Sequence, residues 1–224
     1  MIDIKEIFDN DEVAKKISLW LGGDVDATEL AGAAEYAVET NVGAVSVVPR
    51  DVKTVWPWLE KTKIKIMPRF VLNSAGGRSI SDVAIDINSA FKNGANGAQI
   101  ILQLNDLARF ADSINAVRND LFFNKDLSIG LGVFDVWPLD WGGVFDVLKK
   151  IHASSLLLIM SHEDNEKSDF TGRIYAALNA WDADKNMELH VMLGESFSRA
   201  TQVYRLAMAN KPELVDKLKL FVSY

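Results

Sequence analysis

Residues 98–104 read AQIILQL, residues 106–122 read DLARFADSINAVRNDLF and residues 127–134 read LSIGLGVF. The first and third stretches are apolar on both faces, which is typical of strands in a parallel sheet covered by helices. The middle stretch places Leu107, Phe110, Ile114 and Val117 on one face at helical spacing. Together they predict a strand–helix–strand unit in which the helix connects two parallel strands.

The same unit recurs along the chain. We predict further strands over Ile17–Leu21, Ala44–Val48, Ile64–Phe70, Ser155–Met160, Leu189–Leu193 and Leu218–Ser223. The predicted helices cover Thr28–Thr40, Asp51–Glu60, Ser79–Asn93, Trp141–His152, Thr171–Asp182 and Ser196–Ala209. Pro57 is expected to bend or end its helix. Seven or eight alternations without a linker or a change of composition favour one closed barrel.

We therefore predict an α/β fold, a (β/α)8 TIM-type barrel, with residues 1–224 as a single domain and residues 1–15 as an N-terminal helical segment. An open doubly wound sheet is the alternative, but Gly22-Gly23 lacks the G-x-G-x-x-G spacing of a dinucleotide-binding turn. The last predicted strand ends next to Tyr224, so we expect the final part of the helical ring to be missing or supplied by Ile2–Ala14.

The composition is that of a soluble globule, since 49% of the 224 residues are hydrophobic and 25% are charged. A net charge of −7 argues against nucleic acid or an anionic membrane surface as a partner, because phosphate binding needs a basic face. The first ten residues carry acids where a signal peptide is basic, and no apolar run approaches the roughly 18 residues of a membrane span. With no cysteine, the chain has no disulfide, thiolate metal site or Cys nucleophile. A cytoplasmic location is expected.

Four segments in order carry a family resemblance. Asp26-Ala27-Thr28 opens a predicted helix, and the strand AVSVV that follows it ends at Pro49. Ile64-Lys65-Ile66 lies in the next strand, and Ser79–Ala95 reads SISDVAIDINSAFKNGA. In this order they resemble the deoxyribose-phosphate aldolase family over roughly residues 15–105. The resemblance implies a barrel that acts on carbon–carbon bonds through an imine with a lysine.

The same resemblance assigns the family's functional residues to positions of this chain. Counted from Asn93-Gly94-Ala95, the catalytic aspartate falls on Gln99. The Schiff-base lysine falls within Leu156–Met160 and the second lysine within Leu189–Leu193, and neither segment contains a lysine. The glycine-rich phosphate segment is replaced by GESFSR over Gly194–Arg199. Because an imine needs an amine, the resemblance implies that Schiff-base catalysis is lost or altered.

Ligand-binding candidates lie at the C-terminal ends of the strands, where barrels carry function. Arg69 could hold a phosphate or carboxylate, or pair with a neighbouring acid. Gln99 and Gln103 share a strand face by period-2 alternation, either as a structural network or as a ligand-reading pair. Trp137 could stack on a sugar-like ligand or cap the barrel core, and Glu195 could join an anion site at a helix N-terminus.

Asp135, His162 and Glu163 are the catalytic candidates. Asp135 could form an acid/base pair with Asp140 if one were desolvated, and is otherwise a solvated loop acid. His162 could be a general base oriented by Glu163 or a metal ligand, although adjacent loop residues rarely point the same way. No spacing rule supports a metal, so we expect neither a metal nor a cofactor. Lys65 lies near the start of its strand, at the stability end of a barrel, and is a poor nucleophile candidate.

Three functions remain open. The first is a diverged aldolase-like barrel, a pseudoenzyme that binds a small phosphorylated or carboxylated metabolite, with Schiff-base catalysis lost or altered. The second is a non-catalytic barrel that binds another protein through exposed tryptophans such as Trp56 and Trp58. The third is an active aldolase or related carbon–carbon lyase with a relocated lysine, for which Lys167 and Lys219 are better placed than Lys65. A homodimer is left open as the assembly.

Overall fold

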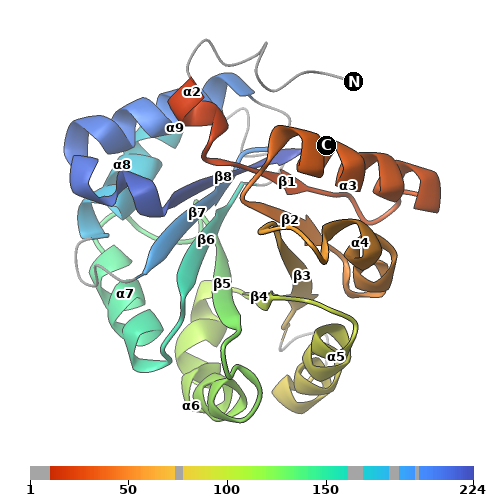
Figure 1. Ribbon diagram of the computed structural model, residues 1–224. Helices are drawn as coiled ribbons and strands as arrows, with labels where there is room; N and C mark the ends of the chain where they lie inside the picture. Colours follow the sequence, from red (N-terminus) through yellow and green to blue (C-terminus); the bar gives the residue numbers. More distant parts are fainter. Residues whose placement is uncertain (1–10, 74–77, 161–168, 182–186, 195–196) are drawn as a thin grey trace.

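The computed structural model describes residues 11–73, 78–160, 169–181, 187–194 and 197–224, and it is a closed barrel of parallel strands in chain order (Figure 1). The strands are β1 (Ile17–Trp20), β2 (Ala44–Val47), β3 (Lys65–Val71), β4 (Gly97–Ile101), β5 (Asp126–Gly132), β6 (Ser155–Ile159), β7 (Glu188–Met192) and β8 (Leu218–Ser223). β8 pairs with β7 and also with β1, where Leu220 lies opposite Ile17. The predicted (β/α)8 TIM-type barrel is therefore confirmed.

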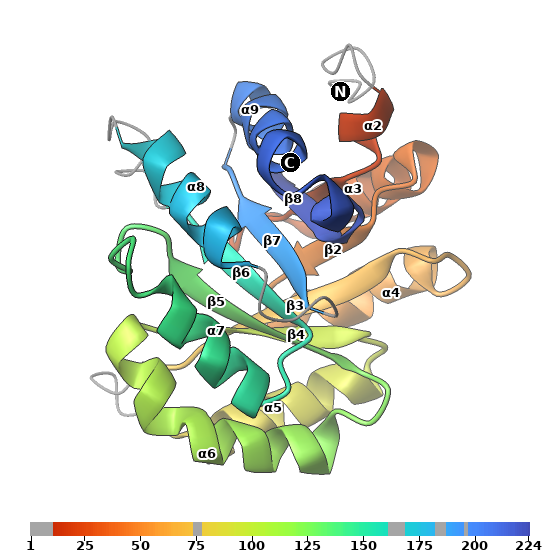
Figure 2. The ribbon, with the colours of Figure 1, turned by 90° about the vertical axis from the view of Figure 1, so that its left-hand side faces the viewer.

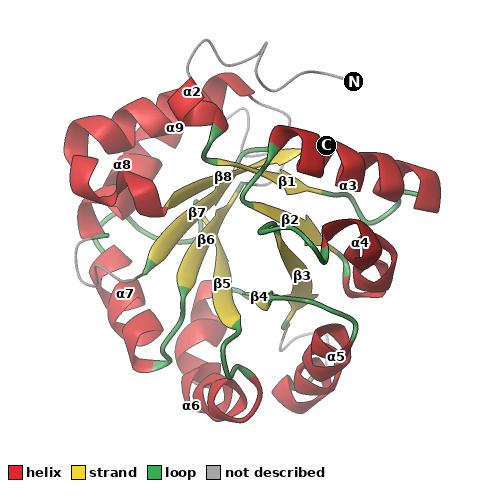
Figure 3. Cartoon of the chain, viewed as in Figure 1, coloured by secondary structure: helices red, strands yellow, loops and turns green. Residues whose placement is uncertain are grey.

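Helices surround the strands (Figure 3). They are α2 (Asp11–Ala14), α3 (Ala27–Thr40), α4 (Val52–Leu59), α5 (Ile80–Lys92), α6 (Leu104–Leu121), α7 (Trp141–Lys150), α8 (Phe170–Ala180) and α9 (Phe197–Asn210), with the 3-10 helices η1 (Pro49–Asp51) and η3 (Pro212–Lys217). Figure 2 shows α7, α8 and α9 outside strands β5 to β8. Of the predicted N-terminal helical segment, Asp11–Ala14 is helical and packs against α9, and residues 1–10 lie outside the described residues.

Two helix starts follow from capping residues in the sequence. Asp26 accepts the backbone N–H groups of Thr28 and Glu29, and the Glu29 carboxylate accepts the Asp26 N–H at 2.9 Å, which completes a capping box. Ser79 and Asp82 form the same arrangement at the start of α5. Such a cap satisfies N–H groups that would lose water when the helix packs on the barrel.

One predicted strand end is wrong, and one predicted helix, Asp51–Glu60, is found as Val52–Leu59 without ending at its proline. β4 ends at Ile101 rather than Leu104, because the Gln103 carbonyl already accepts the N–H groups of Asp106 and Leu107 as the N-cap of α6. Gln103 is therefore exposed and does not share a strand face with Gln99. α4 does not end at Pro57 but continues to Leu59, and the Glu60 N–H bonds the Trp56 carbonyl at 2.9 Å.

The buried residues form two compartments. A large apolar core fills the layer between the strands and the helices. A small second cluster inside the barrel contains Ala44, Met67, Leu157 and Phe221, with Trp20, Ile159 and Met192 packed against it. By strand alternation the inner face also carries buried polar side chains, namely Ser18, Ser46, Gln99, Ser128, Ser155 and His190. Buried polar groups need partners, so the barrel interior is where a functional site is sought.

Candidate functional site

Three neighbouring strands bring a polar cluster to the inner face of the barrel toward its C-terminal end. Arg69 of β3 lies opposite Gln99 of β4, and Ser46 of β2 lies opposite Met67, two residues before Arg69. Because successive side chains alternate between the two faces of a strand, Ser46, Arg69 and Gln99 all point inward. This places two of the predicted ligand-binding residues, Arg69 and Gln99, side by side.

The Arg69 guanidinium is fixed by contacts with β1, with the residue that follows β1, and with β2. Nη1 donates to the Ser46 carbonyl at 3.0 Å and to Ser46 Oγ at 3.2 Å, and Nη2 donates to the Leu21 carbonyl. The guanidinium carbon also lies 4.1 Å from the centroid of the Trp20 ring, which is within cation–π range. The group is thus held in one orientation before any ligand arrives.

Ser46 links Arg69 to Gln99. The Ser46 hydroxyl accepts from Arg69 and donates to Gln99 Oε1 at 2.6 Å, which fixes the orientation of the Gln99 amide. Gln99 is fully buried, and its Nε2 has no hydrogen-bond partner among the described residues. On the next strand, Ser128 lies opposite Gln99, and its buried hydroxyl likewise has no partner in this part of the structure. Unmet hydrogen bonds of this kind are rare in native interiors and need an explanation.

Burial dominates the electrostatics of this cluster. Desolvation lowers the pKa of Arg69 to about 10, and the nearby charge of Asp51 offsets only part of that effect. Asp51 is itself buried, and its pKa is raised by burial against the opposing charges of Arg50 and Arg69. Its Oδ1 lies 3.7 Å from Arg50 Nε, whereas among the described residues no carboxylate lies within ion-pair distance of Arg69. Arg69 is therefore a half-buried cation that has no carboxylate within ion-pair distance among the described residues.

The other predicted site residues do not join this cluster. Trp137 lies in the loop after β5 and is 70% exposed, so it does not cap the barrel core; the Arg173 guanidinium lies 5.5 Å from its ring. Asp135 is exposed, and its carboxylate lies against Gly132, where a side chain would collide with it. His162, Glu163 and Glu195 lie outside the described residues.

The positions of the expected imine-forming lysines face the barrel interior without an amine. On β6 the inner residues are Ser155, Leu157 and Ile159, and on β7 they are Glu188, His190 and Met192.

The lysines that do face the interior in the described strands are Lys65 and Lys219, at the N-terminal ends of β3 and β8. Lys65 pairs with Asp126, and Lys219 pairs with Glu188 at 2.6 Å. The position of Lys65 at the stability end is as predicted. Lys219 lies at the same end and is no better placed, and Lys167 lies outside the described residues.

Sequence reasoning missed Ser46, Trp20 and Ser128. Ser46 carried one usable signal, because it is the polar residue within the apolar strand AVSVV. Trp20 gave none, since an aromatic residue at a strand end is more often core.

The described residues lack two further features. They contain no group of three or more His, Cys, Asp or Glu side chains arranged to hold a metal ion. No helix among them is both long enough and apolar enough to cross a membrane.

Comparison with known proteins rests on structure. No family model matches the chain, and no curated protein matches it. A protein from Toxoplasma gondii ME49, provisionally described as a deoxyribose-phosphate aldolase, superposes with a TM-score of 0.75 at 13% identity and covers 99% of this chain and 94% of its own. The deoxyribose phosphate aldolase of Aeropyrum pernix, described as a unique tetramer, gives a TM-score of 0.71 at 10% identity over 97% and 89% of the two chains. A protein of Streptococcus agalactiae, provisionally described as the copper homeostasis protein CutC, superposes with a TM-score of 0.62 at 12% identity. The match covers 92% of this chain and 97% of that protein. At these identities the likeness establishes the barrel fold that this chain shares with aldolases.

Proposed function

We propose that this chain is a diverged deoxyribose-phosphate-aldolase-like barrel that binds a small phosphorylated or carboxylated metabolite at its C-terminal mouth, with Schiff-base catalysis lost or altered. The observation that carries the proposal is Arg69, a half-buried guanidinium without a paired carboxylate among the described residues. Its position at the C-terminal half of β3 is where barrels bind their substrates.

Arg69 and Gln99 both carry N–H groups that have no acceptor among the described residues. Arginine has five N–H groups, and within the described part of the chain Arg69 makes three hydrogen bonds, all to neutral oxygens. Partial burial of a guanidinium without a paired carboxylate is unfavourable, because the charge loses hydration that no nearby anion replaces. Gln99 Nε2 adds a fully buried donor that has no acceptor in the described chain. A phosphate or carboxylate oxygen would satisfy both groups.

The proposal that imine chemistry is lost or altered rests on the state of the interior lysines. A nucleophilic lysine must be an amine, and apolar burial or a nearby cation achieves this by lowering its pKa. Asp126 and Glu188 are instead ion-paired with Lys65 and Lys219, and the contact with Asp126 raises the pKa of Lys65, which favours its ammonium form. An active aldolase with a relocated lysine is therefore the weaker reading.

A protein-binding barrel is the second candidate, and one surface feature favours it. Trp56 and Trp58 are 39% and 44% exposed on either side of Pro57 in α4, as the sequence predicts. The Trp56 indole packs on the backbone of Gly94 and so presents a fixed aromatic edge. Exposed, rigid tryptophans are common anchors of protein interfaces.

Ligand-dependent thermal stability tests the metabolite proposal. The panel contains glyceraldehyde 3-phosphate, glycerol 3-phosphate, pyruvate and malate at matched ionic strength, with chloride as the reference. We expect at least one compound to raise the Tm of the wild type and not of Arg69→Met, which keeps the aliphatic stem and removes the charge. Arg50→Met is the matched control, because Arg50 is an exposed arginine that bonds the Gly23 carbonyl, two residues after the Leu21 carbonyl that Arg69 contacts. Equal shifts in Arg69→Met and the wild type would remove Arg69 from the site.

Borohydride trapping tests the loss of imine chemistry in the same samples. The protein is reduced in the presence of each carbonyl compound and its intact mass is measured. We expect no adduct, since the described interior lysines are ion-paired. A stable adduct, with its position mapped, would identify a relocated nucleophile and overturn this part of the proposal.

A further inference from the structure

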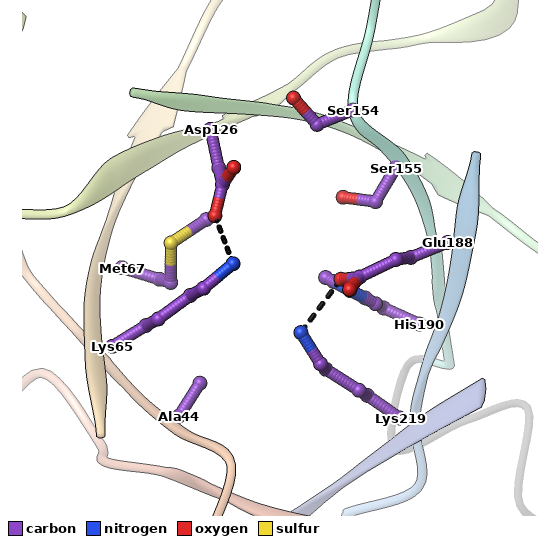
Figure 4. A pocket seen from close by; sticks show the side chains of 9 residues that line it. All are labelled: Ala44, Lys65, Met67, Asp126, Ser154, Ser155, Glu188, His190 and Lys219. Carbon is purple, nitrogen blue, oxygen red and sulfur yellow. Dashed lines mark hydrogen bonds and ion pairs between the residues drawn. The ribbon is translucent and has the colours of Figure 1, made fainter. Parts of the chain in front are cut away.

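The N-terminal end of the barrel, opposite the Arg69 cluster, encloses a polar cavity of about 130 Å³ (Figure 4). It is lined by Ala44, Lys65, Met67, Asp126, Ser154, Ser155, Glu188, His190 and Lys219. Six of these come from the first or second residue of their strands, so the cavity lies at the N-terminal edge of the sheet. The proposed metabolite site uses none of them.

The cavity contains hydrogen-bonding groups that the described protein leaves unused. Lys65 and Lys219 each donate one hydrogen bond, to Asp126 and Glu188, and each ammonium therefore has two further N–H groups. Figure 4 shows both ammonium groups directed toward the centre of the cavity from opposite sides. Ser155 is 1% exposed, and its hydroxyl has no partner among the described residues.

His190 supplies a neutral acceptor that no described residue uses. Its Nε2 lies 2.9 Å from Glu188 Oε2, and the Glu188 carboxylate also accepts from Lys219, so it is ionised and Nε2 carries the proton. Burial lowers the pKa of His190, so the ring is neutral and Nδ1 is a bare lone pair. His190 is 3% exposed, and Nδ1 has no partner in the described part of the chain.

The unused groups define the chemistry of a ligand. Four ammonium N–H groups and a hydroxyl call for several acceptor oxygens close together, and His190 Nδ1 calls for one donor. The fixed charges of the lining cancel, because Lys65 and Lys219 are balanced by Asp126 and Glu188. A depression that shares Lys65 and Asp126 with the cavity adds Lys63 and Lys125 at its outer rim. The approach is thus basic in a chain whose net charge is −7, and it favours entry of an anion.

The solvent exposure and the volume of the cavity both suit a small ion. The side chains of Lys65, Asp126 and Glu188 are 38%, 34% and 32% exposed, so the cavity is open to solvent. Its volume is a few times the roughly 30 Å³ that a water molecule occupies in the liquid. A tetrahedral oxyanion with five heavy atoms is of this size.

We propose that the N-terminal cavity binds a tetrahedral oxyanion that retains a proton to donate, of which hydrogen phosphate is the simplest. Its oxygens accept from Lys65, Lys219 and Ser155, and its hydroxyl donates to His190 Nδ1. Sulfate has the same shape but no proton at neutral pH, so the His190 lone pair would face a sulfate oxygen. The cavity should therefore distinguish two ions that differ in one proton.

Isothermal titration calorimetry at pH 7.5 and constant ionic strength tests the proposal with inorganic phosphate and sulfate. We expect one phosphate site per chain and sulfate binding weaker by about tenfold or more, the effect of a hydrogen bond to a charged group. A parallel titration with glycerol 3-phosphate separates a free ion from a phosphomonoester. Tighter binding of either the ester or the free ion supports the site and assigns its source. Equal affinities for phosphate and sulfate in the wild type, or no heat with millimolar phosphate, would overturn the proposal without any variant.

Variants then locate the site. Ser155→Ala removes a hydroxyl that has no protein partner, so it should fold normally and weaken phosphate binding by about tenfold. His190→Leu removes the Nδ1 lone pair while Glu188 keeps its hydrogen bond from Lys219, so phosphate should bind no better than sulfate. Arg50→Met replaces an exposed arginine that belongs to neither proposed site, so it is the control and should leave the phosphate affinity unchanged. Loss of phosphate binding in Arg69→Met alone would assign the anion to the proposed metabolite site and refute the second one.

Discussion

Ser46→Ala tests whether the Arg69 cluster is the rigid, pre-oriented unit that its hydrogen bonds suggest. The substitution removes the donor to Gln99 Oε1 and one of the acceptors of Arg69 Nη1. The Ser46 carbonyl still accepts from Arg69 at 3.0 Å, so the arginine loses little. The main effect falls on Gln99, whose oxygen is left without a partner at a position with no access to water.

The expected loss of stability is the cost of leaving the Gln99 oxygen unpaired, because Arg69 keeps its bond to the Ser46 carbonyl. An unsatisfied buried acceptor costs roughly 1–3 kcal/mol, so we expect Ser46→Ala to lower the free energy of unfolding by about 2 kcal/mol. Gln99→Met removes the same hydrogen bond and also the partnerless Nε2, in a side chain of similar volume. Gln99→Met should lower the free energy of unfolding by less than about 1.5 kcal/mol. In the double variant no amide oxygen is left unpaired, so the combined loss should be smaller than the sum of the single losses by about 1–2 kcal/mol.

The assay is urea unfolding at pH 7.5, followed by circular dichroism and tryptophan fluorescence. Coincident transitions by the two probes are needed before a free energy is taken from the midpoint. Ser128→Ala is the matched control, since it removes a buried serine hydroxyl on the adjacent strand that has no partner in the described chain. We expect a change within about 0.5 kcal/mol for this control. Equal losses for Ser46→Ala and Ser128→Ala, or additive losses in the double variant, would refute the linked cluster.

The remaining predictions concern acid stability and two glycines. Burial lowers the pKa of His190 below its ordinary 6.5, so the unfolded chain takes up a proton that the folded chain does not, and stability should fall as the pH drops from 7 to 5. Burial alone would raise the pKa of Glu188, but His190 and Lys219 outweigh it and lower that pKa to about 2, so its stabilising contribution is lost further down, between pH 4.5 and 2. His190→Gln removes the first loss only; urea midpoints at pH 7 and 5 that fall equally in both proteins would contradict this assignment. Gly94 has φ +106°, and a side chain there would run into the Trp56 indole, so Gly94→Ala should destabilise by about 1–3 kcal/mol and change the Trp emission. Gly142 lies in α7 with nothing within 4 Å of an added methyl group, so Gly142→Ala should gain up to about 1 kcal/mol. Differential scanning calorimetry checks both, and a similar loss at the two positions would show that the Trp56 contact does not matter.

The barrel was predictable because each strand and helix has a recognisable local sequence pattern. Apolar runs alternate with amphipathic stretches, and Asp26 and Ser79 mark two helix starts by their capping chemistry. The end of β4 was not predictable, because the letters LQLN continue an apolar alternation through Leu102 and Gln103. What ends the strand is a change of hydrogen-bond partner, in which the Gln103 carbonyl turns from the sheet to the helix. That change leaves no mark on hydrophobicity.

The candidate sites were harder because they depend on register. Arg69 was predicted at the end of its strand and Gln99 on the face of the next strand, but Ser46 reaches them across 23 and 53 residues of sequence. Which side chains face each other inside a barrel depends on the stagger of all eight strands, and no single strand contains that information. The N-terminal cavity was missed for a smaller reason. Asp126 and Glu188 each precede the predicted strand by one residue, so the predicted strands did not include them.

The two ends of this barrel differ in a way that bears on its chemistry. At the C-terminal end the half-buried Arg69 has no paired carboxylate in the described chain, and at the N-terminal end each described inward-facing lysine has one. Burial alone would lower the pKa of Lys65, but its hydrogen bond and charge interaction with Asp126 raise it above the usual value. An imine needs the reverse arrangement, an amine that burial has neutralised and no carboxylate reprotonates. Between the two ends, Met67, Leu157 and Phe221 pack inside the barrel, so a ligand at one end does not reach the ionic groups of the other. Anion binding is therefore the chemistry that both ends support, at two sites whose variants can be measured separately.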